Sequence, residues 1–375
     1  MTCIRKTSIY DSFVCTEDRC PENCCRGWRI HIDDKTVQKY LEMKGLKGVC
    51  IRLFMQIDDY MPYFSKKAIR CPLLTPDWHC AIQRHIGEDC MPEICRRFPR
   101  DIRNYGSFTE YHLDLSCTRA AFLLLENCGR VTLEEYEGES EAPRYGNNDD
   151  GEFLEDLNAS RKKLLEYFKV REKCDLFKLD DIFKKALNIA FDDHERVLSC
   201  RDEGRAEKIP VKVFPLPLEI LNDMIGKSLY KDRMLWYSPF FYRLFKLYFK
   251  YFDNLTPTKG EYLYRSLLRD LLAGYPDVNA HMFEYIRYSL ERDYLTTFED
   301  YSFIKRILDA LLCSNVILLL EAVYFKRYSV MNGQIEARII SLVERRARHN
   351  DFIIGKLADI LRLSTPEYFS SKGSC

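Results

Sequence analysis

The chain has 375 residues, and its 57 Lys and Arg residues are balanced by 57 Asp and Glu residues. This length is enough for two or three domains and a substantial core. The lack of net charge argues against a nucleic-acid-binding protein held mainly by phosphate contacts, so any charged binding surface must be local.

The first residues, MTCIRKTSIYDSFVC, contain no apolar stretch of the kind that forms the core of a signal peptide. We therefore expect a cytoplasmic protein. Of its 16 cysteines, 12 fall within the first 128 residues. Because thiols stay reduced in the cytosol, this density indicates metal binding or catalysis before disulfide formation.

Residues 1–130 are expected to form an irregular, Cys-rich, metal-binding N-terminal domain. Helical patterns occur only over 34–44 and 116–127, and alternation typical of strands is limited to short pieces such as GWRIHID, residues 27–33. A folded segment with so little regular structure needs another source of stability, which bound metal can supply.

Residues 131–157 are expected to form an acidic linker or an exposed loop. The stretch from Glu134 to Asp156 holds ten acidic residues and one basic residue, together with Gly, Pro and Asn, and shows no apolar periodicity. A docking surface for a basic partner is the alternative interpretation.

Residues 158–375 are expected to form an α-helical domain, so the fold class is mainly α. Apolar residues recur three and four positions apart, which predicts helices over 160–173, 180–198, 218–230, 239–252 and 260–274 and two more between 302 and 363. The longest apolar run, Ala310–Leu320, is too short to span a bilayer and predicts a buried helix.

Aromatic residues are dense in one part of this half: Trp236, Tyr237, Phe240, Phe241, Tyr242, Phe245, Tyr248, Phe249, Tyr251 and Phe252. Most are expected in the core because aromatic side chains carry large buried areas. Since they exceed what one helix face can bury, a partner-binding groove is the alternative.

The cysteines form two blocks, one reading Cys15-x4-Cys20-x3-Cys24-Cys25 and the other holding Cys71, Cys80, Cys90 and Cys95, with Cys117 following. Soft thiolates bind zinc, Cu(I) or iron-sulfur clusters. The chain has no Cys-x2-Cys pair of the kind common in zinc ribbons, which favours an iron-sulfur site. The radical S-adenosylmethionine spacing is also missing, because Gly27 stands at the third position. Small buried hydrophobic thiols are the alternative.

Arg96, Arg97 and Arg100 follow directly in CRRFPR. Guanidinium groups at such positions can stabilise an anionic cluster or hold a carboxylate or phosphate of a small ligand. A solvated basic turn is the alternative. No Gly-rich phosphate cradle follows a strand, so neither a Rossmann-type methyltransferase nor a P-loop is indicated.

Three stretches together resemble the flagellin lysine-N-methylase family: SFVCTEDRCPENCCRGWRIHIDDKTVQKY, CPLLTPDWHCAIQRHIGEDCMPEICRRFPR and LDLSCTRAAFLLL. ERRARHN, from Glu344, is similar to the family's C-terminal IEHN region, with Arg348 where Glu is common. The Cys-rich part is also similar to a broader group described as zinc- or iron-chelating.

The resemblance implies an enzyme that transfers a methyl group from S-adenosylmethionine to lysines of flagellin and contains an iron-sulfur cluster, expected to be 4Fe-4S. The cysteines that match the family are Cys15, Cys20, Cys24, Cys25, Cys71, Cys80, Cys95 and Cys117, whereas Cys3, Cys50, Cys90 and Cys128 lie outside its pattern. The catalytic base is not identified. A metal-stabilised scaffold or an electron-transfer module without enzyme activity is the alternative function.

Overall fold

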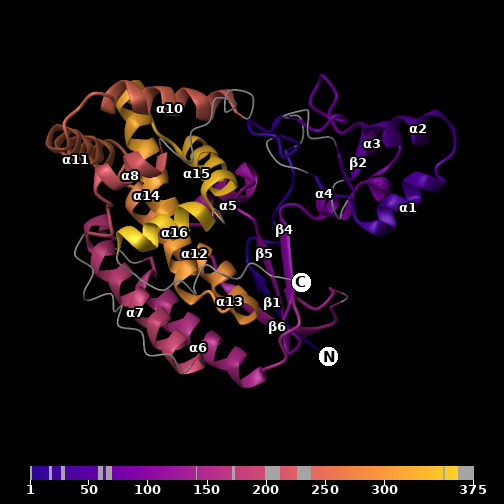
Figure 1. Cartoon of the computed structure of the whole chain (residues 1–375), viewed down its shortest axis with the longest axis horizontal. Coiled ribbons are helices and arrows are strands. Elements are labelled where there is room, and N and C mark those ends of the chain that lie inside the picture. The colour runs from indigo at the N-terminus through magenta and orange to yellow at the C-terminus, as the bar shows by residue number, and fades with distance from the viewer. Residues whose placement is uncertain are drawn as a thin grey trace.

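The structure, a computed structural model, describes residues 2–16, 19–26, 30–57, 62–64, 70–140, 142–170, 174–198, 212–225, 238–348 and 351–361. The fold is mainly α with a small sheet. Figure 1 shows the strands of the larger sheet upright beside the helical layer, with helices α1 to α4 grouped in a smaller lobe beyond the end of β4.

The larger sheet has four strands in the order β4-β5-β1-β6. Its strands are β1 (Thr2–Thr7), β4 (Arg100–Asn104), β5 (Phe108–Leu113) and β6 (Leu133–Gly138). Strand β1 runs parallel to β5 and antiparallel to β6, while β4 and β5 pair antiparallel. The first and last segments of residues 1–138 are therefore joined in one sheet.

This sheet was not expected, and its burial pattern explains why. Strand β5 is buried at five of its six positions, so it shows no alternation of apolar and polar residues. Two of the buried residues of the sheet are charged, Arg103 and Glu110. Strand β6, in contrast, is mostly exposed and acidic. Residues 131–157 thus contain β6 and the start of a helix that begins at Gly151.

Outside the smaller lobe, helices occur in the stretches where periodicity predicted them, but the helix over Val278–Asp293 was not predicted, and three helices, not two, lie in the described part of the chain between 302 and 363. The helices outside this lobe are α5 (Thr118–Glu126), α6 (Gly151–Tyr167), α7 (Leu179–Leu198), α8 (Leu218–Met224), α10 (Pro239–Phe252), α11 (Pro257–Gly274), α12 (Val278–Asp293), α13 (Thr297–Asp300), α14 (Phe303–Tyr328), α15 (Gly333–Ala347) and α16 (Asp351–Ile360). The helix predicted over 218–230 is described only to Ile225, and Trp236 and Tyr237 lie outside the described residues.

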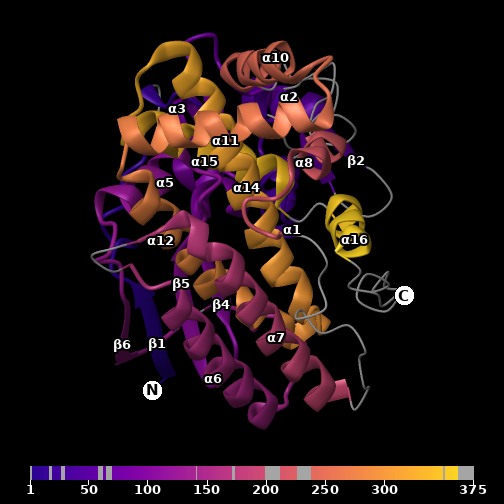
Figure 2. The same ribbon diagram turned by 90° about the vertical axis from the view of Figure 1, so that its left-hand side faces the viewer.

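Helix α14 is the central element of this layer, packed against α7, α10, α11, α12, α15 and α16 (Figure 2). The helix is long and apolar enough to cross a membrane, but 94% of its most apolar stretch is buried inside the protein. Among the described residues it is the one such helix. The prediction of a buried helix at Ala310–Leu320 is confirmed.

The smaller lobe holds α1 (Asp34–Glu42), α2 (Gly45–Phe54), β2 (Met55–Ile57), β3 (Pro62–Phe64), α3 (Ala81–His85) and α4 (Glu93–Arg97). Its core is small and separate, formed by Ile30, Ile32, Tyr40, Ile51, Phe64, Leu73 and Ile82. Cys71, Cys80, Cys90 and Cys95 pack against this core. Residues of β5 and α5 belong instead to the large core shared with the helices, and Cys3 of β1 packs against it.

Buried ion pairs join the sheet to the helices. Glu110 of β5 accepts two hydrogen bonds from Arg161 of α6, at 2.6 and 2.8 Å, and lies 3.2 Å from the His112 ring. Burial alone would raise the pKa of Glu110, but Arg161 and His112 together hold it well below its usual range. The carboxylate therefore stays charged in the core.

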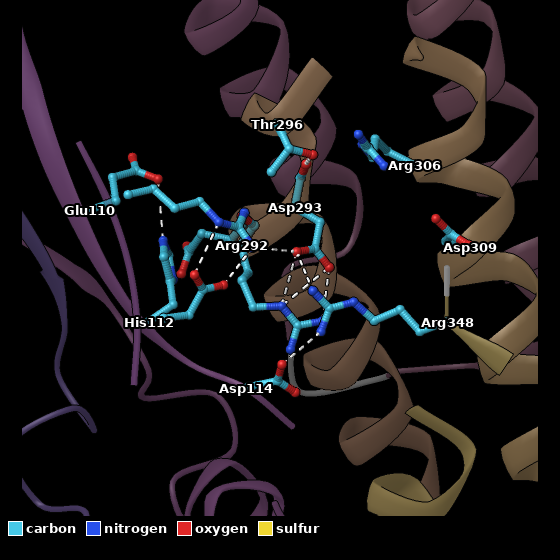
Figure 3. A network of polar contacts seen from close by, with 12 residues as sticks. Glu110, His112, Asp114, Arg292, Asp293, Thr296, Arg306, Asp309 and Arg348 are labelled. Atoms are coloured by element: carbon cyan, nitrogen blue, oxygen red, sulfur yellow. Dashed lines mark hydrogen bonds and ion pairs between the residues drawn. The ribbon is translucent and has the colours of Figure 1, made fainter. Parts of the chain in front are cut away.

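A second group of buried charges lies at the end of α12, as Figure 3 shows. Asp293 is paired with Arg292, Arg103 and, at 2.8 Å, Arg348 at the end of α15. Arg348 also reaches Asp114, at 3.5 Å, in the loop that follows β5. Burial would raise the pKa of Asp114, but Arg348 and then Arg292 lower it to about 2.

Arg161→Ala is expected to destabilise the protein by about 3–5 kcal/mol, because it leaves the Glu110 carboxylate buried and unpaired. The same change at Arg265, whose pair with Glu261 is exposed, is expected to cost less than about 1 kcal/mol. Urea unfolding of both variants measures the difference.

The lowered pKa of Glu110 also fixes the sign of the pH dependence. The stabilisation that the charged Glu110 gives the folded state is fully present above the unfolded carboxyl pKa of about 4.3. It is lost as the pH falls below that value. The difference in unfolding free energy between wild type and Arg161→Ala should therefore become smaller below about pH 4. A difference that stays constant down to pH 3 would contradict this assignment.

Candidate thiol-lined site

Two adjoining cavities are lined by cysteines, an inner one within the smaller lobe and an outer one where this lobe meets the helical layer. The inner one, of about 50 Å³, is lined by Cys24, Cys25, Cys71, Cys80 and Cys95 together with apolar side chains. The outer one is a cleft of about 360 Å³, lined by Cys15, Cys20, Cys24, Cys25, Cys80, Cys95 and Cys117. All eight cysteines that match the family pattern therefore line one cavity or the other.

The remaining cysteines of this half lie elsewhere among the described residues. Cys90 is next to the core of the smaller lobe, where its sulfur is 3.7 Å from the Asp89 carboxylate. Cys3 is in β1 and donates to Glu135 at 2.9 Å. Cys50 is exposed on α2, and Cys128 follows α5.

Residues 20–25 are held in place by the helical layer. Glu22 is 3% exposed, and its carboxylate accepts hydrogen bonds from Arg338 of α15 at 2.7 Å and from Ser238, the N-cap of α10, at 3.0 Å. Arg345 of α15 donates to the Glu22 carbonyl oxygen at 2.8 Å. Within the segment, the Asn23 side chain accepts from the Cys25 amide at 2.8 Å. The two adjacent thiols thus have a fixed backbone.

The same helix fixes Cys117. Arg345 donates to the Ser116 carbonyl oxygen at 2.7 Å, and Ser341 is hydrogen-bonded to Thr118 at 2.8 Å. Asp114 accepts from the Ser116 amide at 2.8 Å and is itself paired with Arg348. Cys117 then stands at the N-cap position of α5, facing the cleft.

The second cysteine block reaches the cavities from the smaller lobe. The Cys71 amide donates to the Cys25 carbonyl oxygen at 2.7 Å, which joins the two blocks directly. Cys80 pairs with Leu74 across a tight loop, in which Trp78 has a φ of 67°. This left-handed conformation is unusual for a large side chain, and it places the indole, 38% exposed, at the wall of the cleft. Cys95 lies on α4.

For most of these thiols, burial is the main influence on the pKa, and it raises the pKa. It raises the pKa of Cys71 to about 11 and that of Cys117 to about 12, and it also raises that of Cys20. Cys24 is the exception, because a hydrogen bond with Cys25 lowers its pKa to about 7 and Arg345 acts in the same direction. That bond raises the pKa of Cys25 correspondingly.

The donor chemistry suits a metal that prefers sulfur. Five thiols around one small cavity, some lying close enough to raise the pKa of one another, form a set that a soft cation would stabilise as thiolates. However, among the described residues no three His, Cys, Asp or Glu side chains are arranged to hold a metal ion. The chain thus supplies suitable donors around a cavity without a preformed ligand geometry.

The three arginines singled out in the sequence separate in the structure. Arg96 and Arg100 line the cleft, and Arg100 also lies over the rings of Tyr10 and Phe13. Arg97 pairs with Glu93 one turn earlier on α4, at 2.8 Å, and is not among the described residues that line the cleft.

Sequence reasoning missed other cleft residues: Glu22, Asn23, Trp78, Arg119 and Arg345. Glu22 and Asn23 lie inside the first cysteine block, and Trp78 lies between Cys71 and Cys80, so position beside cysteines was the available signal. Arg345 belongs to ERRARHN, far away in sequence, and only the fold brings it to the cleft.

Known proteins resemble only part of the chain. The lysine-N-methylases of Salmonella choleraesuis and Salmonella typhimurium are each 28% identical over 144 residues, covering 35% of this chain and 35% of each relative. Flagellar biosynthetic protein FliU of Salmonella muenchen is 25% identical over 139 residues, covering 35% of this chain and 82% of FliU.

The matched region thus spans about a third of the length of the two lysine-N-methylases. No protein-family model and no solved structure matches the chain.

Glu22→Gln tests whether the helical layer fixes the first cysteine block. The glutamine amide keeps the size of the side chain but lacks the negative charge that binds Arg338 of α15 and Ser238 at the start of α10. Residues 20–25 are therefore expected to exchange their backbone amide hydrogens at least about tenfold faster. Hydrogen exchange read by mass spectrometry measures this.

Glu88→Gln is the matched control, because Glu88 also lines the cleft but lies in the smaller lobe. Its exchange over residues 20–25 should equal that of wild type. Equal exchange in Glu22→Gln and wild type would show that the contacts of Glu22 do not hold this segment.

Proposed function

We propose that the protein is a cytoplasmic lysine N-methyltransferase that transfers a methyl group from S-adenosylmethionine to lysine side chains of flagellin. The observation that carries the proposal is the cleft itself, in which thiols, arginines and an exposed indole converge. The partial similarity to lysine-N-methylases supports the reaction, and the similarity to FliU supports the flagellar substrate.

The cleft is large enough for the methyl donor, and its arginines suit the donor's carboxylate. A volume of about 360 Å³ lies within the range of small-molecule sites, about 300–1,000 Å³. Four arginines line it, Arg96, Arg100, Arg119 and Arg345, against two glutamates. Arg96 and Arg100 can bind the donor's carboxylate, and the Trp78 ring offers a flat surface on which its adenine can stack.

The transfer is a polar displacement. The lysine nitrogen uses its lone pair to form a bond to the methyl carbon, the bond from that carbon to sulfur breaks, and its electron pair stays on sulfur to give S-adenosylhomocysteine. The nitrogen must first lose a proton, since free lysine has a pKa of about 10.4. The cleft arginines would lower that pKa, because like charges disfavour the ammonium form.

A metal centre, which we propose to be a 4Fe-4S cluster, would be held by cysteines around the inner cavity. Cys24, Cys25, Cys80 and Cys95 line both cavities, so they are the favoured ligands, with Cys71 as a further candidate. Such a centre would stabilise the smaller lobe, whose apolar core is limited to a few side chains. The transfer itself requires no electron from it.

Replacing Cys25, Cys80 or Cys95 by Ala is expected to abolish metal binding and reduce solubility together, because metal binding is coupled to folding. Cys90→Ala is the matched control, since Cys90 lies in the same lobe but outside both cavity walls described. Iron, sulfide and zinc analysis of anaerobically purified protein reads the result.

Iron and sulfide in wild type and Cys90→Ala, and neither in the other variants, is the expected outcome. Zinc in place of iron would overturn the cluster assignment. Metal lost in Cys90→Ala and kept in Cys95→Ala would overturn the choice of ligands.

Incubation of the full chain with flagellin and S-adenosylmethionine is expected to add methyl increments to flagellin lysines, detected by mass spectrometry. The co-product should be S-adenosylhomocysteine, formed without a strong reductant, because the reaction is a displacement. Deoxyadenosine formed only with a low-potential reductant would instead reveal radical chemistry.

Neighbouring arginines provide the positional control. Arg96→Gln should weaken binding of the donor about five- to tenfold, as expected for loss of one partly exposed charged contact. Arg97→Gln, with Arg97 paired to Glu93, should not. Unmodified flagellin with every preparation, despite full metal loading, would favour the metal-stabilised scaffold or electron-transfer module.

A further inference from the structure

A second concave surface lies beside the cleft, between α10, α14 and α15. This groove has a volume of about 390 Å³ and is lined mainly by apolar and aromatic side chains. Leu244 and Leu247 come from α10, and Tyr324 and Tyr328 come from α14. Tyr328 is 46% exposed, so part of the aromatic surface of the groove faces solvent.

The groove uses the side of α10 that the core leaves uncovered. Phe241, Phe245 and Tyr248 on this helix are buried, whereas Phe240 and Leu247 are only partly buried and line the groove. The dense aromatic run of the sequence therefore serves two surfaces, one in the core and one open. Apolar side chains in an open groove suit the apolar residues of a bound polypeptide segment.

The charge of the groove selects the kind of segment. No carboxylate occurs among its described lining residues, which include Arg243 and Arg338. Arg338 is neutralised by Glu22, whose Oε1 lies 2.5 Å from the Arg338 Nη2. Arg243 donates to the Pro239 carbonyl oxygen, and no acidic side chain in the described part of the chain lies within ion-pair distance of it. Its positive charge is complementary to a carboxylate on the partner.

The groove and the cleft share a wall. Pro21 lines the groove, and its neighbours Cys20 and Glu22 line the cleft. Helix α15 contributes to both, with Arg338 in the groove and Arg345 in the cleft. A polypeptide bound in the groove would therefore lie next to the space in which the donor is proposed to bind.

We propose that this groove binds an acidic, apolar segment of the protein substrate and so holds the substrate beside the cleft in which its lysine reacts. The inference rests on the proposed function for the identity of the partner. The groove's preference for acidic over basic segments stands on its own residues and can be measured without methyl transfer.

The experiment measures binding of two labelled peptides to the full chain by fluorescence anisotropy, without donor. One peptide places Glu and Leu on a helical pattern, and the other has Lys in place of each Glu. The acidic peptide is expected to bind at least about tenfold more tightly. Arg243→Glu should remove most of this preference for the acidic peptide. Tyr328→Ala should weaken the binding of the acidic peptide.

Lys246→Glu is the matched control. Lys246 is an exposed cation on the same helix and is not among the lining residues, so the change in net charge is identical. It should alter the binding of the acidic peptide less than about twofold, and circular dichroism should show all variants to be folded.

Equal binding of the two peptides, or equal effects of Arg243→Glu and Lys246→Glu, would overturn the proposal. Self-association of the wild type that Arg243→Glu abolishes would also overturn it, by assigning the groove to a second copy of the chain. Flagellin methylation that persists when the peptide preference is absent would overturn only this inference. Peptide preference without any methylation would overturn only the proposed function.

Discussion

A polar stripe on α15 is the constraint on which the site depends. Arg338, Ser341, Arg345 and Arg348 recur at helical spacing, so they share one face of the helix. They contact Glu22, Thr118, the Ser116 carbonyl oxygen and Asp114 respectively. One helix from the end of the chain thereby fixes both ends of the cysteine set, at residues 20–25 and at Cys117.

The stripe is effective because the contacts it makes are largely buried. Glu22 is almost fully buried, so its charge must be satisfied by Arg338 and Ser238, and moving the segment would leave it without partners. At the far end of the stripe, Asp293 and Asp114 keep the Arg348 guanidinium in place. Arg348 thus serves the packing of α15 against α12 and the sheet.

Sequence periodicity located the helices well and the sheet poorly. The helices predicted over 180–198, 239–252 and 260–274 were confirmed within a few residues, because each has one clear apolar face. Helix α6 begins at Gly151 instead of Ser160, since Asp150 caps it inside the acidic stretch. The strands escaped detection because buried charges such as Glu110 interrupt their apolar pattern, and the main partner of Glu110, Arg161, comes from a distant helix.

The site shows the same division between local and distant information. Apart from Cys90, the cysteines of both blocks line the two cavities together with Cys117, and clustering in sequence alone did not set Cys90 apart. It could not indicate that Arg97 turns toward Glu93 while Arg345 arrives from α15. A chain with no net charge can therefore still concentrate arginines around one cleft. Because the field of exposed charges fades within about 8 Å in physiological salt, that local excess acts on what enters the cleft and little beyond it.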